Sequence, residues 1–272
     1  MLTAPSASRE ILQIKICGER NTGSGYLEAL ISRNLETNCL RGGLPKPLRR
    51  IFPESERARD WYFKATRRHN LGWKHALAPS QEDLSIARLD PTRILFLTLT
   101  KNPYAWLLSL FRRPYHAKRN HKNFADFLAA NWKTVGRENA PRFFMNPIEM
   151  WNQKNTSYVK LGDYATVVTC RYEDLLGDPE GFLETICRDH GLERRQRPFE
   201  NVTRAIKGQD ADKTFDDYRD YYLNERWRPE INRAEFCQIN DSLDERLLSH
   251  FHYSRIEPIS LEDNEKSTAK LD

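Results

Sequence analysis

The chain has 272 residues, of which 39% are hydrophobic and 30% are charged, and its net charge is +5. This length allows one large domain or two small ones, and the composition is typical of a globular protein with many solvated faces. The mild basic charge suits an anionic ligand but is too small to indicate nucleic acid by itself, and no apolar run approaches the length of a membrane span.

Strands and helices alternate along the chain. We predict strands over residues 12–17, 93–100 and 165–171, a short strand or strand end over 72–76, and a long loop over 41–53. Helices are predicted over 25–34, 54–69, 79–89, 104–112, 180–190, 215–227 and 243–251. The strand at 93–100 is almost continuously apolar, which is typical of a parallel strand covered on both faces. The pattern predicts a three-layer α/β/α fold around a central, mostly parallel sheet. We expect one domain over residues 1–272, with a loose leader at 1–10 and a polar tail at 258–272.

The number and spacing of the cysteines indicate whether the protein works in a reducing or an oxidising compartment. Their number, five, is odd, and none has CxxC spacing; they are Cys17, Cys39, Cys170, Cys187 and Cys237. Two of them lie in apolar, strand-like runs, so we predict thiols in a reducing compartment, with neither a disulfide set nor a zinc site. The first ten residues lack the apolar core of a signal peptide, and we therefore expect a cytoplasmic protein.

The first predicted strand runs into a loop rich in Gly, Ser and Thr at residues 18–25, and this loop begins a helix. Backbone N–H groups and the positive end of a helix converge on a phosphate in such loops. The loop lacks the Lys of a nucleoside-triphosphate P-loop and the third Gly of a dinucleotide fingerprint. We predict an anion site, and an ordinary junction capped by Thr22 or Ser24 is the alternative.

A second candidate anion site follows the strand at 93–100. Lys101 ends that strand, and the pair Asn102-Pro103 is typical of a helix start, because Asn is a good N-cap and Pro suits the first helical position. Ser109 lies about two turns further along this helix and can reach the same anion as Lys101. The alternatives are a solvated lysine and a serine packed on a helix face.

Together these residues resemble the sulfotransferases that use PAPS (3′-phosphoadenosine 5′-phosphosulfate). In the order of that family, the resemblance is carried by residues 19–27, 101–109, 171–179 and the pair Lys207-Gly208. It covers residues 11–210 and is best at 11–30 and 93–113. It implies a sulfotransferase architecture similar to that of P-loop NTPases, PAPS as co-substrate, and no metal.

The resemblance also implies roles for single residues. It assigns the 5′-phosphosulfate to Arg20, Asn21, Thr22, Gly23, Ser24, Gly25 and Tyr26, and the 3′-phosphate to Lys101, Ser109, Lys207 and Gly208. The family often carries a Lys where this chain has Asn21. Arg20, as a bidentate donor, and Lys74 are the two candidates for the cation that stabilises the leaving phosphate.

Family members commonly have a His or Glu base at a strand end between the two PAPS motifs. His75 lies in that interval, and a histidine can accept a proton near neutral pH. The resemblance thus implies His75, Lys74 and Arg20 as catalytic residues. The alternatives are a structural histidine and a lysine that points to solvent.

We predict a sulfotransferase that moves a sulfuryl group in line from PAPS to a hydroxyl or amine of a carbohydrate or small-molecule acceptor. The acceptor pocket is expected from the loops at 41–70 and 113–160. One alternative is an ATP-dependent small-molecule kinase, which would need magnesium and the loop Lys that is absent here. The other is a non-catalytic nucleotide-binding member of the same fold. We expect neither a nucleic-acid partner nor a membrane span.

Overall fold

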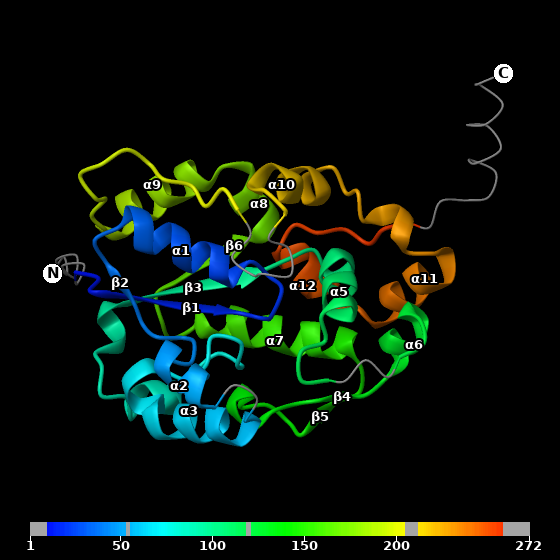
Figure 1. Ribbon diagram of the computed structural model, residues 1–272, viewed down its shortest axis with the longest axis horizontal. Coiled ribbons are helices and arrows are strands. Elements are labelled where there is room, and N and C mark those ends of the chain that lie inside the picture. Colours follow the sequence, from blue (N-terminus) through cyan, green and yellow to red (C-terminus); the bar gives the residue numbers. More distant parts are fainter. Residues whose placement is uncertain (1–9, 53–54, 118–120, 205–211, 258–272) are drawn as a thin grey trace, which may run out of the picture.

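The computed structural model describes residues 10–52, 55–117, 121–204 and 212–257 (Figure 1). Within these residues, four parallel strands form the central sheet. Their spatial order is β2 (Asn38–Cys39), β1 (Gln13–Gly18), β3 (Ile94–Thr100) and β6 (Val167–Arg171). Every residue of β3 is buried, as expected of a strand covered on both faces.

Helices surround the sheet and continue beyond its carboxyl edge. The α-helices are α1 (Ser24–Asn34), α2 (Lys46–Ile51), α3 (Glu56–Asn70), α4 (Gln81–Ser85), α5 (Pro103–Arg112), α6 (Phe124–Ala129), α7 (Pro147–Leu161), α8 (Tyr172–Gly177), α9 (Pro179–His190), α10 (Phe215–Leu223), α11 (Arg233–Ser242) and α12 (Glu245–His250). Short 3₁₀ turns are η1 (Pro91–Arg93), η2 (Gly136–Glu138) and η4 (Arg228–Glu230), and β4 (Trp132–Lys133) pairs antiparallel with β5 (Phe143–Phe144). No helix in the described part of the chain is long and apolar enough to cross a membrane.

Buried side chains pack helices against both faces of the central sheet. On one face of the sheet, α1 and α9 pack leucines and isoleucines against alternate residues of β1 and β3. On the other face, α7 places Tyr158 and Leu161 against Cys17 and Phe96. Figure 1 shows α1 and α9 above the sheet and α7 below it. The predicted three-layer α/β/α fold with a parallel sheet is confirmed.

The strand ends are aligned. Gly18 pairs with Leu99, and Thr100 pairs with Arg171, so β1, β3 and β6 finish along one edge of the sheet. Ligands of open parallel sheets bind outside this edge. Both candidate anion sites of the sequence begin there.

Some predicted elements differ from the structure. Residues 72–76 form a turn, and the prediction of a strand there is wrong, because Leu71 and Gly72 have positive φ angles (59° and 82°) that interrupt an extended backbone. The predicted loop at 41–53 contains α2, and the helix predicted over 79–89 is shorter, at Gln81–Ser85. The leader at 1–9, the tail at 258–272 and the pair Lys207-Gly208 lie outside the described residues.

Candidate active site

A cleft of about 830 Å³ opens where β1 and β3 end. Its lining on the sheet side consists of predicted site residues: Asn21, Gly23, Ser24, Gly25, Tyr26, Lys74, His75, Lys101 and Ser109. The opposite wall is aromatic, with Tyr172, Phe215, Tyr218 and Tyr222. Charged residues of both signs surround it: the cations include Arg112, Arg204 and Lys213, and the anions are Asp212, Asp216, Asp217 and Asp220. The fold therefore brings the two predicted anion motifs and His75 into one cavity.

The loop after β1 presents the start of α1 to this cleft. Gly23 is the N-cap with φ of 86°, and no side chain caps the helix. An added Cβ at Gly23 would lie 2.3 Å from the ring of Tyr172, so only glycine fits. Within the described residues no acceptor binds the N–H groups of Ser24, Gly25 and Tyr26. These donors and the helix dipole have the geometry that the predicted anion site requires.

The alternative of a junction capped by Thr22 or Ser24 is wrong. The Thr22 hydroxyl donates to the carbonyl of Glu19 (2.6 Å) and closes the turn inside the loop. Thr22 is buried and is not among the described residues that line the cleft. Its predicted contact with the phosphosulfate stays a prediction.

Three hydrogen bonds tie this loop to the second motif. Asn21 Nδ2 donates to the carbonyl of Ser109 (3.1 Å), and Trp106 Nε1 donates to the carbonyl of Arg20 (2.8 Å). Lys101 Nζ donates to the carbonyl of Asn21 (3.4 Å). These bonds thus fix the position of the loop relative to residues that lie about 80 positions further along the chain.

Lys101 and Ser109 form a pair, as their spacing predicts. The Lys101 side chain is 1% exposed, and its Nζ donates to Ser109 Oγ (3.0 Å). The ammonium lies 3.6 Å from the ring centroid of Tyr222, a cation–π contact. The Tyr222 hydroxyl is 3.2 Å from Ser109 Oγ, so α10 covers this pair from the far wall of the cleft.

His75 has a defined tautomer. Its Nδ1 donates to the carbonyl of Gly18 (2.6 Å), which leaves Nε2 with a lone pair. Burial lowers the pKa of His75 well below 6.5, and the charges of Lys74 and Arg20 lower it further. The ring is therefore neutral at physiological pH, and in this form a histidine can accept a proton.

The turn that carries His75 is held by two buried lysines that the sequence analysis did not single out. Lys15 Nζ, on β1, donates to the carbonyls of Asn70 and Gly72 (2.6 Å each), and burial lowers its pKa to about 8. Lys154 Nζ, on α7, donates to the carbonyl of His75 (2.5 Å). No neighbouring strand in the described part of the chain donates to these three carbonyls, and the two ammonium groups supply the hydrogen bonds instead.

Lys74 lines the cleft beside α1. Its Nζ pairs with Glu28 Oε2 of α1 (2.6 Å), and its side chain is 14% exposed. Gly42 lies directly behind it, since a Cβ there would be 2.6 Å from the Cβ of Lys74. The ion pair keeps the ammonium beside the first turns of α1.

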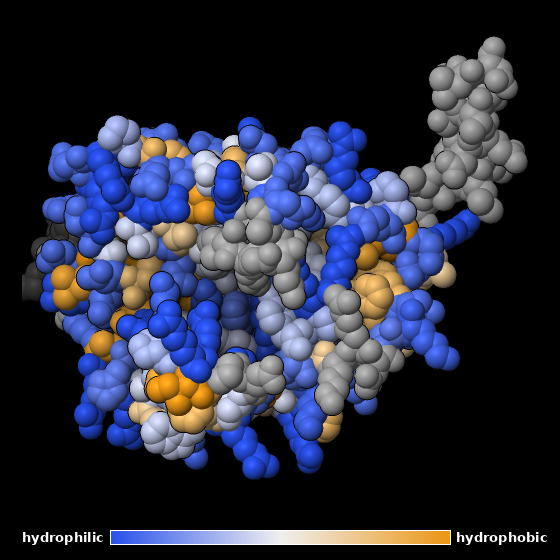
Figure 2. Space-filling view, viewed as in Figure 1, coloured by the Kyte–Doolittle hydropathy of each residue, from blue (hydrophilic) through white to orange (hydrophobic). Residues whose placement is uncertain are grey.

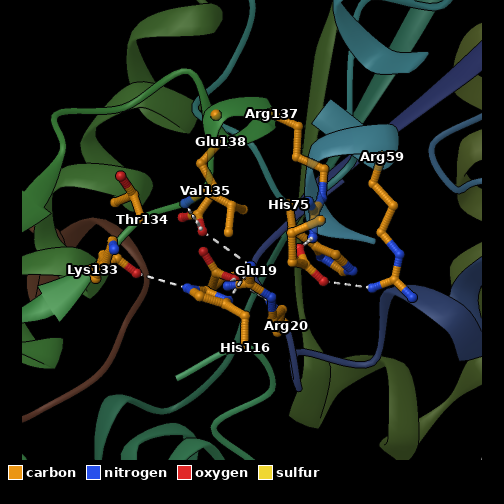
Figure 3. A network of polar contacts seen from close by, with 12 residues as sticks. Glu19, Arg20, Arg59, His75, His116, Lys133, Thr134, Val135, Arg137 and Glu138 are labelled. Carbon is orange, nitrogen blue, oxygen red and sulfur yellow. Dashed lines mark hydrogen bonds and ion pairs between the residues drawn. The ribbon is translucent and has the colours of Figure 1, made fainter. Parts of the chain in front are cut away.

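Arg20 takes part in a buried network (Figure 3). Its guanidinium pairs with Glu138 Oε1 (3.0 Å) and Glu19 Oε1 (3.4 Å), donates to His116 Nδ1 (3.3 Å), and lies 4.6 Å from the ring centroid of Trp73. Arg20 is not among the described residues that line the cleft. Its predicted role toward the phosphosulfate is untested and stays a prediction.

Glu138 and Lys154 complete this network and were missed by the sequence analysis. Lys154 Nζ lies 2.7 Å from Glu19 Oε2 and 3.0 Å from Glu138 Oε2. Although burial alone would raise the pKa of Glu138, Lys154 and Arg20 lower it to about 2. No local pattern marks Glu138, because its partner Arg20 is 118 positions away.

Comparisons with known proteins give a limited result. No protein-family model matches the chain, and no curated protein matches it. Several solved structures are similar to it, and two of them serve as examples. One is the sulfotransferase domain from the Synechococcus PCC 7002 olefin synthase, with 15% identity, a TM-score of 0.47, and coverage of 93% of this chain and 99% of that chain. The other is the sulfotransferase domain from the curacin biosynthetic pathway, with 11% identity, a TM-score of 0.47, and coverage of 92% and 100%.

Proposed function

We propose that this chain is a PAPS-dependent sulfotransferase. The observation that supports it most is the convergence, in one cleft, of the start of α1 with the pair Lys101–Ser109, next to a neutral His75. PAPS carries anionic groups at both ends of its ribose, and two separate anion sites in one cavity suit such a ligand.

The chain's own groups fit the donor. The N–H groups of Ser24, Gly25 and Tyr26 donate to the 5′-phosphosulfate in this proposal, because they belong to an uncapped helix start. Lys101 Nζ and Ser109 Oγ, 3.0 Å apart, are placed to hold the 3′-phosphate. The aromatic wall of Tyr172 and Tyr222 excludes water from that phosphate.

The donor supplies an activated sulfuryl group, and the protein positions it and moves a proton. His75 Nε2 takes the proton of the acceptor hydroxyl or amine while the acceptor oxygen or nitrogen forms its bond to sulfur. The bond from sulfur to the phosphate oxygen breaks, and its electron pair leaves with the phosphate. The positive end of α1 and the ammonium of Lys74 stabilise this charge.

We assign the leaving-group cation to Lys74 in preference to Arg20. Lys74 lines the cleft and is fixed by Glu28 beside α1, whereas the Arg20 guanidinium is bound to Glu19 and Glu138. Arg20 then acts as a positioning residue for the loop. The acceptor, a carbohydrate or small molecule, enters from the side of residues 41–70 and 113–160.

The test is ligand-induced stabilisation followed by turnover. PAP, the desulfated product, should raise the Tm of the full chain saturably. At a PAP concentration of about a hundred times Kd, the free energy of unfolding should increase by about 2.7 kcal/mol. Lys101→Met should abolish this shift, and Lys160→Met, at an exposed lysine of α7, should leave it unchanged. His75→Asn, which can still donate to Gly18, should keep the PAP shift and lose release of PAP from PAPS.

Other outcomes would replace the proposal. A shift with magnesium and ATP but none with PAP would favour the kinase. A PAP shift without any PAP release from PAPS over a panel of acceptors would favour a non-catalytic nucleotide-binding protein.

A further inference from the structure

One face of α3 carries a stripe of exposed cations with a tryptophan in its middle. Arg57, Trp61, Lys64 and Arg68 follow the spacing i, i+4, i+7, i+11, which places them on one side of the helix. All four are exposed, and Trp61 is 71% exposed. A single exposed aromatic residue is normal at a protein surface, so the feature that marks this face is the tryptophan set within a stripe of cations.

The acidic residues of α3 point the other way. Glu56 Oε2 pairs with Arg137 Nη2 (2.5 Å), and Asp60 Oδ1 pairs with Arg137 Nη1 (2.8 Å). Asp60 also accepts from the N–H of Gly136 (2.9 Å). Since η2 neutralises both carboxylates on the inner side, the outer side of α3 presents only cations.

The segment before α3 extends this surface. Residues 41–52 hold the exposed cations Arg41, Lys46, Arg49 and Arg50 and contain no Asp or Glu. No residue of α2 is buried, and the two residues at its end, Ile51 and Phe52, are 64% and 43% exposed. Figure 2 shows a hydrophobic area over α2, at the lower left, surrounded by hydrophilic residues.

We propose that this surface docks the protein on an anionic lipid membrane. We call it the basic face: Arg41, Lys46, Arg49, Arg50, Ile51, Phe52, Arg57, Trp61, Lys64 and Arg68. Lys and Arg attract anionic headgroups, while Trp sits at the headgroup level and apolar side chains enter the acyl boundary. A soluble polyanion such as a sulfated glycan would satisfy the cations, but it offers nothing apolar to Ile51 and Phe52.

The basic face adjoins the cleft. Gly42, at its start, supports Lys74: the Lys74 N–H donates to the carbonyl of Gly42 (3.1 Å). The inner side of α3 contacts the turn of His75 through Phe63 and Trp73, whose ring centroids are 6.4 Å apart. Docking by this face therefore holds the wall of the cleft next to the membrane.

The test uses the full chain and vesicles of phosphatidylcholine with or without phosphatidylserine. Trp61 is a built-in probe, because Trp106, Trp132, Trp151 and Trp227 are buried and Trp73 is covered by the guanidinium of Arg137 at 4.3 Å. We expect cosedimentation and a blue shift of emission with anionic vesicles only, both weakened by salt. Trp61→Ala should remove the blue shift and weaken binding.

Charge reversal distinguishes this face from the net charge of the protein. The variant R57E/K64E/R68E should bind at least about 100-fold more weakly, since each surface cation contributes about fivefold and reversal adds repulsion to the loss of attraction. The matched control K122E/K160E/R246E changes exposed cations outside the basic face and should bind within about threefold of the wild type. Unchanged stabilisation by PAP in both variants would show that the fold and donor site are intact.

Three results would overturn the proposal. The first is equal loss of binding in the variant and the control, and the second is no binding to anionic vesicles at all. The third is a Trp61 blue shift with soluble heparin and none with vesicles, which would assign the basic face to a sulfated glycan. None of these results depends on sulfuryl transfer, so failure here leaves the proposed function untouched.

Discussion

The buried charge of Glu138 should be worth a large part of the stability of this fold. Glu138 is fully buried between Arg20 and Lys154, which hold the loop after β1 and the turn of His75. The variant Glu138→Gln keeps the shape of the side chain and removes its charge. Two buried cations then face only Glu19, and breaking such a network by removing one partner typically costs 3–5 kcal/mol.

The pKa of Glu138 gives an independent magnitude. A lowering from 4.5 to about 2 corresponds to about 3 kcal/mol at neutral pH, at about 1.4 kcal/mol for each unit of pKa. The folded pKa lies below the unfolded one, so this contribution is complete above pH 4.5. It is lost as the pH falls toward 2, because the folded state must then bind the proton as well.

Urea unfolding followed by circular dichroism measures the effect. We expect Glu138→Gln to lower the free energy of unfolding by about 3 kcal/mol at pH 7 with an unchanged m-value, and the difference from wild type to shrink below pH 4.5. The control Glu245→Gln, at a carboxylate that is 74% exposed, should stay within about 0.5 kcal/mol. A loss below about 1 kcal/mol for Glu138→Gln at pH 7 would refute the reasoning.

Two further predictions concern the cleft. Gly23→Ala should destabilise the fold by more than about 1 kcal/mol and remove stabilisation by PAP in a thermal-shift titration, because its Cβ would meet Tyr172 at a positive φ. The control Gly25→Ala has open space around its Cβ and should be tolerated. Equal effects of the two changes would contradict this prediction. The ring of His75 should titrate below pH 6.5 in NMR spectra of the free protein, as burial and the charges of Lys74 and Arg20 require. PAP should raise that midpoint because it brings negative charge, and a midpoint at or above 6.5 without ligand would show that the ring is solvated.

The parts of the fold that follow from local rules were predictable. The apolar run of β3 and the Asn-Pro start of α5 are visible in the sequence, and the Asn102 side chain does accept from the N–H of Tyr104 (3.1 Å). Gly191, with φ of 65°, ends α9 where the sequence predicts. Such signals depend on a few neighbouring residues.

Elements whose order depends on distant partners were not predictable. The turn at 72–76 resembles a strand end in the sequence, but its backbone is held by Lys15 and Lys154 from other segments. The strand β2 has two residues and forms only beside β1. Neither carries a periodic pattern long enough to be read.

The candidate site shows the same division. Topology predicts that the loop after β1 and the residues after β3 meet at one edge of the sheet, and they line one cleft. The orientation of Arg20 was not predictable, because it depends on Glu138 from a segment far along the chain. In the sequence Arg20 is a cation next to a glycine-rich loop, and in the structure its guanidinium is buried against Glu19 and Glu138.

The charges beneath the loop balance, and this decides what the network can do. Arg20 and Lys154 bring two positive charges, and Glu19 and Glu138 bring two negative ones. A neutral cluster adds little attraction for an anion in the cleft, so under the proposed function it fixes the loop, and the proposal assigns the attraction to α1, Lys74 and Lys101. Glu138→Gln leaves one positive charge in excess below the loop. Its folded fraction should therefore still bind PAP, even though the variant unfolds more easily, and this separates a positioning network from a binding one.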